Sequence, residues 1–88
     1  MKILKFGAIW CPSCLIMNNT INKLKKNYPN LEVINYDYDM EEKLVNKYDI
    51  GSILPVLIFV NEDGEEISRV IGEKSEKELT KIIESIDV

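Results

Sequence analysis

The chain contains two cysteines, Cys11 and Cys14, three positions apart at the end of an apolar run. The segment from Lys2 to Ile9 has the length and apolar content of a buried strand. Pro12 suits the first turn of a helix, where a missing N–H loses no hydrogen bond. A change from strand to helix at this point places both sulfurs at the end of a sheet, beside a helix N-terminus. This junction limits the possible folds more than any other feature of the chain.

The helix N-terminus predicts different roles for the two sulfurs. Unpaired backbone N–H groups and the positive end of the helix dipole favour the thiolate of Cys11, which is the nucleophilic form. Cys14 lies one turn further along, where it can attack a mixed disulfide formed by Cys11 and release the partner. We therefore expect a thiol–disulfide oxidoreductase in which Cys11 is exposed and attacks, while Cys14 faces inward and resolves.

A Cys-x-x-Cys pair also occurs in metal sites and in structural disulfides. Zinc normally takes four ligands, and this chain has no third cysteine and no histidine. A structural disulfide is disfavoured because so short a loop adds little stability. The sequence predicts no metal and no cofactor within one chain. A dimer bridged by a metal ion or an iron–sulfur cluster through Cys11 and Cys14 remains an alternative.

Length, charge and the N-terminal segment narrow the class of protein. The 88 residues predict a single domain over residues 1–88. The formal charge of −4, without a basic stripe, argues against nucleic acid as a partner. The apolar stretch before the cysteines is too short for a signal peptide or a membrane span. We expect a cytoplasmic protein, where a two-cysteine dithiol is kept mostly reduced.

Hydrophobic periodicity and turn signals predict seven elements. Pro55 has no N–H for a sheet ladder, so it belongs at the start of its strand or just before it. Asp39 is expected to cap the second helix, and Ser75 forms a capping box with Glu78 for the third. The expected strands are 2–9, 31–37, 53–60 and 65–71, and the expected helices run from 12 to about 27, from 40 to 47 and from 75 to 86.

The predicted order is β-α-β-α-β-β-α. A parallel crossover in the first half and an antiparallel hairpin in the second make a four-stranded mixed sheet. Helices should cover both faces of this sheet, so the expected class is α/β.

The whole pattern resembles the thioredoxin/glutaredoxin superfamily, in the form of a minimal thioredoxin fold. The resemblance covers nearly the whole chain, from Lys2 to Ile86. It is carried by Phe6, Trp10-Cys11-x-x-Cys14, the strand-opening Pro55, the Asp63-Gly64 turn and Gly72.

The resemblance implies a site around the dithiol. Cys11 would be the attacking cysteine, Cys14 the resolving one, and Pro55 a cis-proline lying against both. An extended substrate would pair with the backbone before Pro55, and the groove would be rimmed by Trp10, Ile53, Leu54, Ile71 and Gly72. A non-catalytic module that holds a client in this groove is the second alternative.

The resemblance also implies partners. Clients would be proteins or small molecules with disulfides, and electrons would come from a flavin-dependent disulfide reductase, with glutathione as a second option. The chain would act as a monomer, without nucleic acid or membrane. Pro12 and Ser13 differ from the usual dipeptides of the family, and they would help to set the redox potential, within roughly −270 to −120 mV.

Lys5 stands where thioredoxins keep a buried aspartate, six residues before the first cysteine. Its stem could pack along the strand while the ammonium leaves at the end of the sheet. Alternatively, the amine could lie beneath the dithiol. There it would stabilise a thiolate when charged, or take the proton of Cys14 when neutral.

Overall fold

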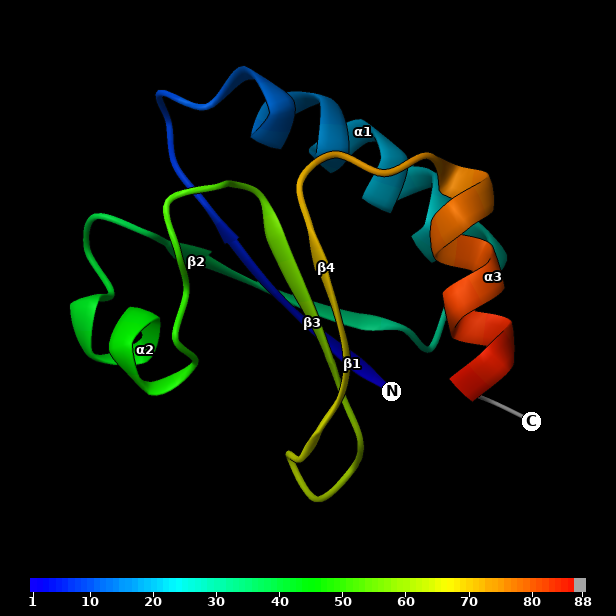
Figure 1. Cartoon of the computed structure of the whole chain (residues 1–88). Coiled ribbons are helices and arrows are strands. Elements are labelled where there is room, and N and C mark those ends of the chain that lie inside the picture. The colour runs from blue at the N-terminus through cyan, green and yellow to red at the C-terminus, as the bar shows by residue number, and fades with distance from the viewer. Residues whose placement is uncertain (87–88) are drawn as a thin grey trace.

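The computed structural model describes residues 1–86, so the last two residues of the expected domain lie outside it. It has the predicted order of elements and the α/β class (Figure 1). The elements are β1 (Lys2–Gly7), α1 (Pro12–Asn27), β2 (Glu32–Asp37), α2 (Glu42–Lys47), β3 (Val56–Val60), β4 (Glu66–Ile71) and α3 (Glu76–Ile86).

The four strands form one mixed sheet in the order β2-β1-β3-β4. β1 runs parallel to β2 and antiparallel to β3, which pairs in turn with β4. Lys5 of β1 stands opposite Asn35 of β2 and Leu57 of β3. These three residues share one face of the sheet, and this face is covered by α1.

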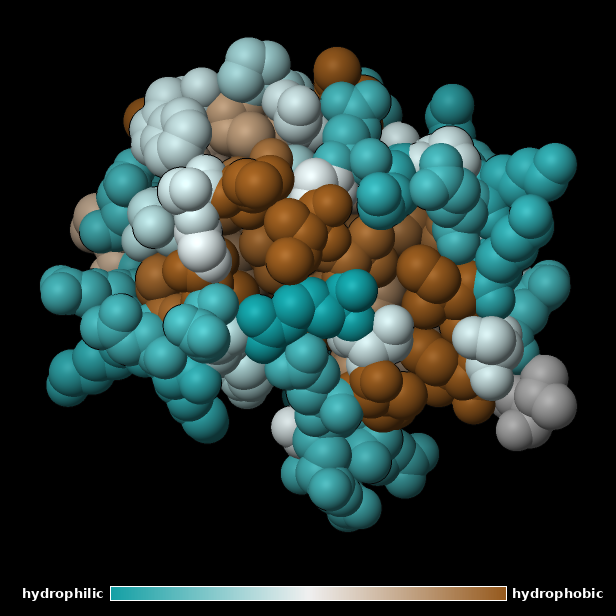
Figure 2. Space-filling view, viewed as in Figure 1, coloured by the Kyte–Doolittle hydropathy of each residue, from teal (hydrophilic) through white to brown (hydrophobic). Residues whose placement is uncertain are grey.

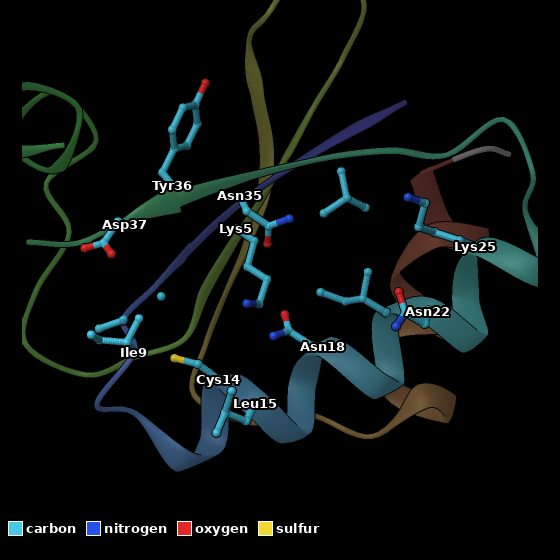
Figure 3. Close-up of a pocket in the computed structure, with 14 residues that line it drawn as sticks. Lys5, Ile9, Cys14, Leu15, Asn18, Asn22, Lys25, Asn35, Tyr36 and Asp37 are labelled. Atoms are coloured by element: carbon cyan, nitrogen blue, oxygen red, sulfur yellow. The ribbon is translucent and has the colours of Figure 1, made fainter. Parts of the chain in front are cut away.

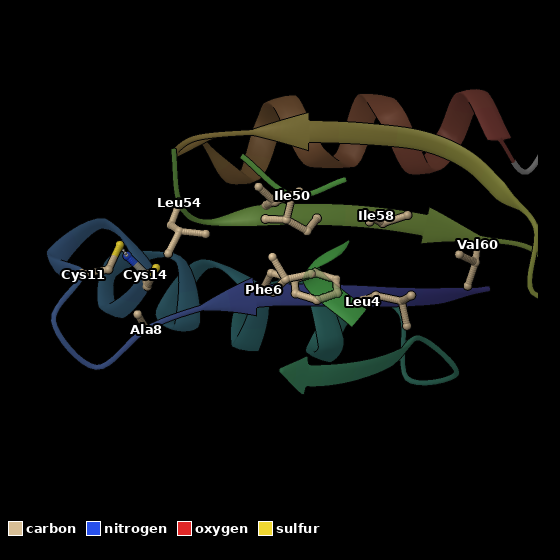
Figure 4. Close-up of a cluster of buried hydrophobic side chains, with 11 residues drawn as sticks. Leu4, Phe6, Ala8, Cys11, Cys14, Ile50, Leu54, Ile58 and Val60 are labelled. Carbon is tan, nitrogen blue, oxygen red and sulfur yellow. Dashed lines mark hydrogen bonds between the residues drawn. The ribbon is translucent and has the colours of Figure 1, made fainter. Parts of the chain in front are cut away.

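Each face of the sheet carries its own hydrophobic core. On one face, α1 and α3 pack through residues such as Met17, Leu24 and Leu79, while α2 covers the other face (Figure 1). The cluster on the α2 face includes Phe6 and continues to both cysteines (Figure 4). The dithiol therefore lies at the end of the sheet, with its sulfurs on a continuous apolar core.

Three expected boundaries are wrong by two or three residues. β1 ends at Gly7 and not at Ile9, because the chain turns so that the N–H of Cys11 donates to the carbonyl of Ala8 at 3.2 Å. β3 begins at Val56 and not at position 53, although Pro55 lies just before the strand as expected for a residue without an N–H for the ladder.

The third wrong boundary is the start of α2, which begins at Glu42 and not at position 40. Its N-cap is Glu41, which makes no side-chain capping bond. Asp39 does not cap this helix, because its carboxylate has another partner near the dithiol.

The local signals in the second half of the chain are confirmed. Ser75 accepts the N–H of Glu78 at 3.2 Å, so the predicted capping bond forms, but the Glu78 carboxylate accepts from the Ser75 hydroxyl at 3.2 Å and not from its backbone N–H, so the box is only half formed. Gly64 has a φ of +82° in the turn between β3 and β4, a conformation that favours glycine. Within residues 1–86 no helix is long and apolar enough to cross a membrane.

Candidate active site

The two sulfurs are held together by the first turn of α1. Cys11 is the N-cap residue of the helix and Pro12 occupies its first turn, as predicted. The N–H of Cys14 donates to Sγ of Cys11 at 3.2 Å, and both thiols are free (Figure 4). One of the unpaired N–H groups of the helix thus points at the Cys11 sulfur, where it favours a negative charge.

The expected exposure of Cys11 is wrong. Cys11 is only 5% exposed, which is close to the 3% exposure of Cys14. The side chain turns inward to accept the helix N–H, and it packs in the same cluster as Ala8 and Leu54. The difference between the two sulfurs therefore lies in their hydrogen bonding and not in their burial.

Burial also affects the chemistry of Cys14. Loss of contact with water raises the pKa of the Cys14 thiol, and its contact with the Cys11 side chain acts in the same direction. The positive charge of Lys5 acts in the opposite direction, because it favours the thiolate. Cys14 therefore remains a thiol under conditions in which an exposed cysteine would already ionise.

Lys5 lies beneath the dithiol, and its ammonium does not leave at the end of the sheet. The residue is only 5% exposed. Its side chain points from β1 toward α1, on the same side of the sheet as Cys14 (Figure 3). Burial lowers the pKa of the Lys5 amine, whereas the nearby sulfurs of Cys14 and Cys11 raise it when they are charged.

Gly7 makes the close approach of Lys5 and Cys14 possible. A Cβ at this position would stand 3.2 Å from Sγ of Cys14 and 3.4 Å from Nζ of Lys5. Both atoms thus border the same small space above Gly7. The need for a glycine here comes from a contact between distant residues, so the sequence alone gave no signal of it.

The expected groove residues of the loop before β3 and of the end of β4 lie next to Pro55. The Leu54–Pro55 peptide bond is cis, as the resemblance implies. The N–H of Gly72 donates to the carbonyl of Pro55 at 2.8 Å, which joins the end of β4 to this loop. Leu54 packs beside both cysteines, whereas Ile53 and Ile71 are exposed. Figure 2 shows a hydrophobic band across the face that carries β4, between α2 and α3.

Asp39, which was expected to cap α2, belongs instead to the surroundings of the dithiol. Its carboxylate accepts a hydrogen bond of 2.8 Å from Nε1 of the exposed Trp10. The bond links the loop before Cys11 to the loop between β2 and α2. Within this second loop, the carboxylate of Asp37 accepts a hydrogen bond of 2.8 Å from the N–H of Asp39, which closes a turn. A partner 29 residues away cannot be read from local sequence patterns.

An open cavity of about 570 Å³ lies between α1 and β2. Its wall includes Lys5, Cys14 and Asn18, as Figure 3 shows. We call it the α1–β2 cavity. Among residues 1–86, no three histidine, cysteine, aspartate or glutamate side chains cluster as metal ligands would.

A sequence model of the thioredoxin family matches residues 1–85. The chain belongs to the thioredoxin family. The thioredoxin of Chlamydia trachomatis is 27% identical over 83 residues, which cover 94% of this chain and 79% of that protein. Thioredoxin H5 of rice, Oryza sativa, is 34% identical over 70 residues, but these cover 80% of this chain and only 50% of the relative.

Solved structures agree with this membership. Thioredoxin-2 of the malaria parasite, described as a component of its protein secretion machinery, superposes with a TM-score of 0.87 and 27% identity. The match covers 96% of this chain and 81% of that one. The thioredoxin of Fasciola hepatica has a TM-score of 0.84 and 28% identity, over 96% and 78% of the two chains. The similarity to these thioredoxins, together with the paired cysteines, shows that the chain is a disulfide oxidoreductase.

Proposed function

We propose that this protein reduces disulfides of proteins and small molecules, with Cys11 and Cys14 as the reacting dithiol. The observation that carries the proposal is the pair of free thiols at the N-terminus of α1, where Cys14 donates its N–H to the Cys11 sulfur at 3.2 Å. This hydrogen bond and the helix dipole stabilise a thiolate on Cys11. A thiolate is the form that attacks disulfides.

The reaction proceeds in two exchanges. The Cys11 thiolate attacks one sulfur of the client disulfide, whose other sulfur leaves as a thiolate and takes up a proton. Cys14 then loses its proton and attacks Cys11, which releases the second client sulfur and leaves a Cys11–Cys14 disulfide. Lys5 supplies the positive charge that the buried Cys14 thiolate needs in this second exchange. It thus replaces the aspartate that thioredoxins keep at this position.

The groove beside the dithiol binds the client. The backbone of Leu54, just before Pro55, would pair with an extended client segment as an added strand. The exposed side chains of Trp10, Ile53 and Ile71 supply an apolar rim for the client. Gly72 supports this rim through its hydrogen bond to the Pro55 carbonyl.

Pro12 and Ser13 separate the two cysteines, and we propose that they tune the redox potential. They occupy the first turn of α1, where small changes alter the N–H groups that face the sulfurs. A low potential is what a reductant requires.

We further propose a cytoplasmic monomer of one domain that receives its electrons from a flavin-dependent disulfide reductase, or else from glutathione. Family membership supports the reductase, because thioredoxins act on disulfide-bonded proteins and are reduced by enzymes of this type. The low potential expected for a reductant agrees with a reducing compartment.

Single-cysteine variants test the roles of the two sulfurs with a protein client. Cys14→Ser should form a stable mixed disulfide with insulin through Cys11, because no resolving thiol remains. Cys11→Ser should form none, since burial raises the pKa of the Cys14 thiol and the helix N–H that favours a thiolate points at position 11 and not at Cys14. Mass spectrometry of the products, before and after excess dithiol, measures both outcomes. Equal trapping by the two variants would contradict Cys11 as the attacking sulfur, and binding without any mixed disulfide would favour a non-catalytic module.

A further inference from the structure

The second exchange requires Cys14 to lose its proton from a buried position. Burial raises the pKa of this thiol, so it does not ionise readily by itself. The helix N–H that points at Sγ of Cys11 stabilises charge on that sulfur and not on Cys14. A base beside Cys14 would therefore speed the step in which Cys14 attacks.

The Lys5 amine lies beside this thiol, and both side chains border the α1–β2 cavity (Figure 3). A Cβ on Gly7 would stand 3.2 Å from Sγ of Cys14 and 3.4 Å from Nζ of Lys5. The two atoms are therefore no farther apart than these two distances together. An amine this close can take a proton from the thiol directly or through one water molecule.

Other titratable groups near the amine are less suited to take this proton. Among residues 1–86 these are Cys11 at the start of α1, Lys25 further along it, and Tyr36 and Asp37 of β2. Asp37 already accepts the N–H of Asp39 at 2.8 Å. The ring of Tyr36 packs against Phe6 on the other face of the sheet, and Lys25 is exposed. Cys11 is bonded to the client at this step, which leaves Lys5 as the base beside Cys14.

The first exchange prepares the Lys5 amine for this role. Burial lowers the pKa of Lys5, whereas negative charge on Cys14 or Cys11 raises it. In the mixed disulfide Cys11 is bonded to the client sulfur and carries no charge. The amine then holds its proton less tightly than before the first exchange, at the step in which Cys14 has to release its own.

We propose that Lys5 is the proton acceptor for Cys14 in the second exchange, and that the α1–β2 cavity passes this proton on to water. The proposal rests on the proposed function, because it concerns one step of that reaction. It goes beyond a fixed positive charge beneath the dithiol, since Lys5 is a neutral amine when the step begins. The charge that stabilises the Cys14 thiolate arises from the proton transfer itself.

Protons and electrons balance without a further reactant. Neutral Lys5 takes the proton of Cys14 and becomes an ammonium. The Cys14 thiolate attacks Sγ of Cys11, the bond between Cys11 and the client sulfur breaks, and that sulfur leaves as a thiolate. The ammonium no longer has a negative sulfur beside it, and it loses its proton to water through the open cavity. The dithiol is oxidised by two electrons and the client disulfide is reduced by two.

The test follows the second exchange by itself. Reduced protein, in excess, is mixed in a stopped-flow instrument with dithiobis-nitrobenzoate, a disulfide that releases one coloured thiol in each exchange. The second release is an intramolecular step, so its rate does not depend on the protein concentration. This rate reports the attack of Cys14 on Cys11.

We expect Lys5→Met and Lys5→Arg to slow the second release about a hundredfold near neutral pH, which is the lower end of the effect of a general base. Arginine keeps the positive charge but cannot act as a base, because its guanidinium stays protonated. The loss should shrink as the pH rises, because hydroxide then takes the proton in place of the amine. Lys25→Met is the matched control, since it removes the exposed lysine of the same cavity, and it should leave the rate unchanged.

A Lys5→Arg variant as fast as the unsubstituted protein would overturn the proposal, because a fixed charge would then be sufficient. A loss that is the same at every pH would also overturn it, since a defect of packing does not respond to hydroxide. Circular dichroism checks that each variant is folded, and the pH profile of Lys5→Met decides if arginine does not fit. A failure of the proposed function would show instead as a missing second release in the unsubstituted protein.

Discussion

Replacing Lys5 by methionine should make the protein more stable and a poorer reductant. The residue is only 5% exposed, and among residues 1–86 its side chain makes no ion pair that the substitution would remove. Methionine keeps most of the unbranched stem that packs between β1 and α1, so little apolar contact is lost. The substitution removes the cost of partly withdrawing the Lys5 ammonium from water.

We expect Lys5→Met to raise the free energy of unfolding by about 1–2 kcal/mol. For a domain of this size, each kcal/mol raises Tm by about 4–8 °C. Urea unfolding followed by circular dichroism, under reducing conditions, measures the difference. Lys23→Met is the matched control, because Lys23 is exposed on α1, and it should change stability by less than about 0.5 kcal/mol.

The gain from Lys5→Met should depend on pH in a defined direction. Burial lowers the pKa of Lys5 below its ordinary value of 10.5. Between the lowered value and 10.5, the unfolded chain binds more protons than the folded one, so the protein with lysine becomes more stable as the pH rises. The advantage of methionine is therefore largest at neutral pH and shrinks toward 10.5. A loss of stability in Lys5→Met, or a gain that stays constant with pH, would refute this reasoning.

Two other substitutions test packing and capping. Gly7→Ala should destabilise the protein by about 1–3 kcal/mol, since its Cβ would press on the Cys14 sulfur at 3.2 Å, whereas Gly51→Ala, with no atom within 4 Å, should not. Ser75→Ala should cost about 0.5–2 kcal/mol in urea unfolding, because the N–H of Glu78 loses its acceptor. An equal effect of the two alanines at glycine positions, or an unchanged Ser75→Ala, would contradict these two interpretations.

Most of the fold could be predicted from the sequence because its signals are local. The change from strand to helix at Pro12, the turn at Asp63–Gly64 and the capping bond of Ser75 each depend on residues a few positions apart. The resemblance to thioredoxins added the cis bond before Pro55, which periodicity cannot show. Two of the three boundary errors fall at strand ends, after Gly7 and before Val56, and the third at the start of α2, where Asp39 bonds to Trp10 and does not cap the helix.

The surroundings of the dithiol were harder to predict because they depend on distant contacts. The burial of Cys11 in a cluster with Leu54, the hydrogen bond of Trp10 with Asp39 and the space above Gly7 all arise where separate elements meet. The sequence allowed two placements of the Lys5 amine, at the end of the sheet or beneath the dithiol. Only the packing of α1 against the sheet places it beneath Cys14.

The redox titration of the Cys11–Cys14 pair tests the central claim most directly. The protein is equilibrated with thiol–disulfide buffers of known potential, and its thiols are then quenched and counted by mass spectrometry. We expect one reversible two-electron transition below about −230 mV, near the potential of thioredoxins, with an internal disulfide in the oxidised form. A potential near about −120 mV would contradict the role of reductant, and the absence of an internal disulfide at every potential would contradict the dithiol itself.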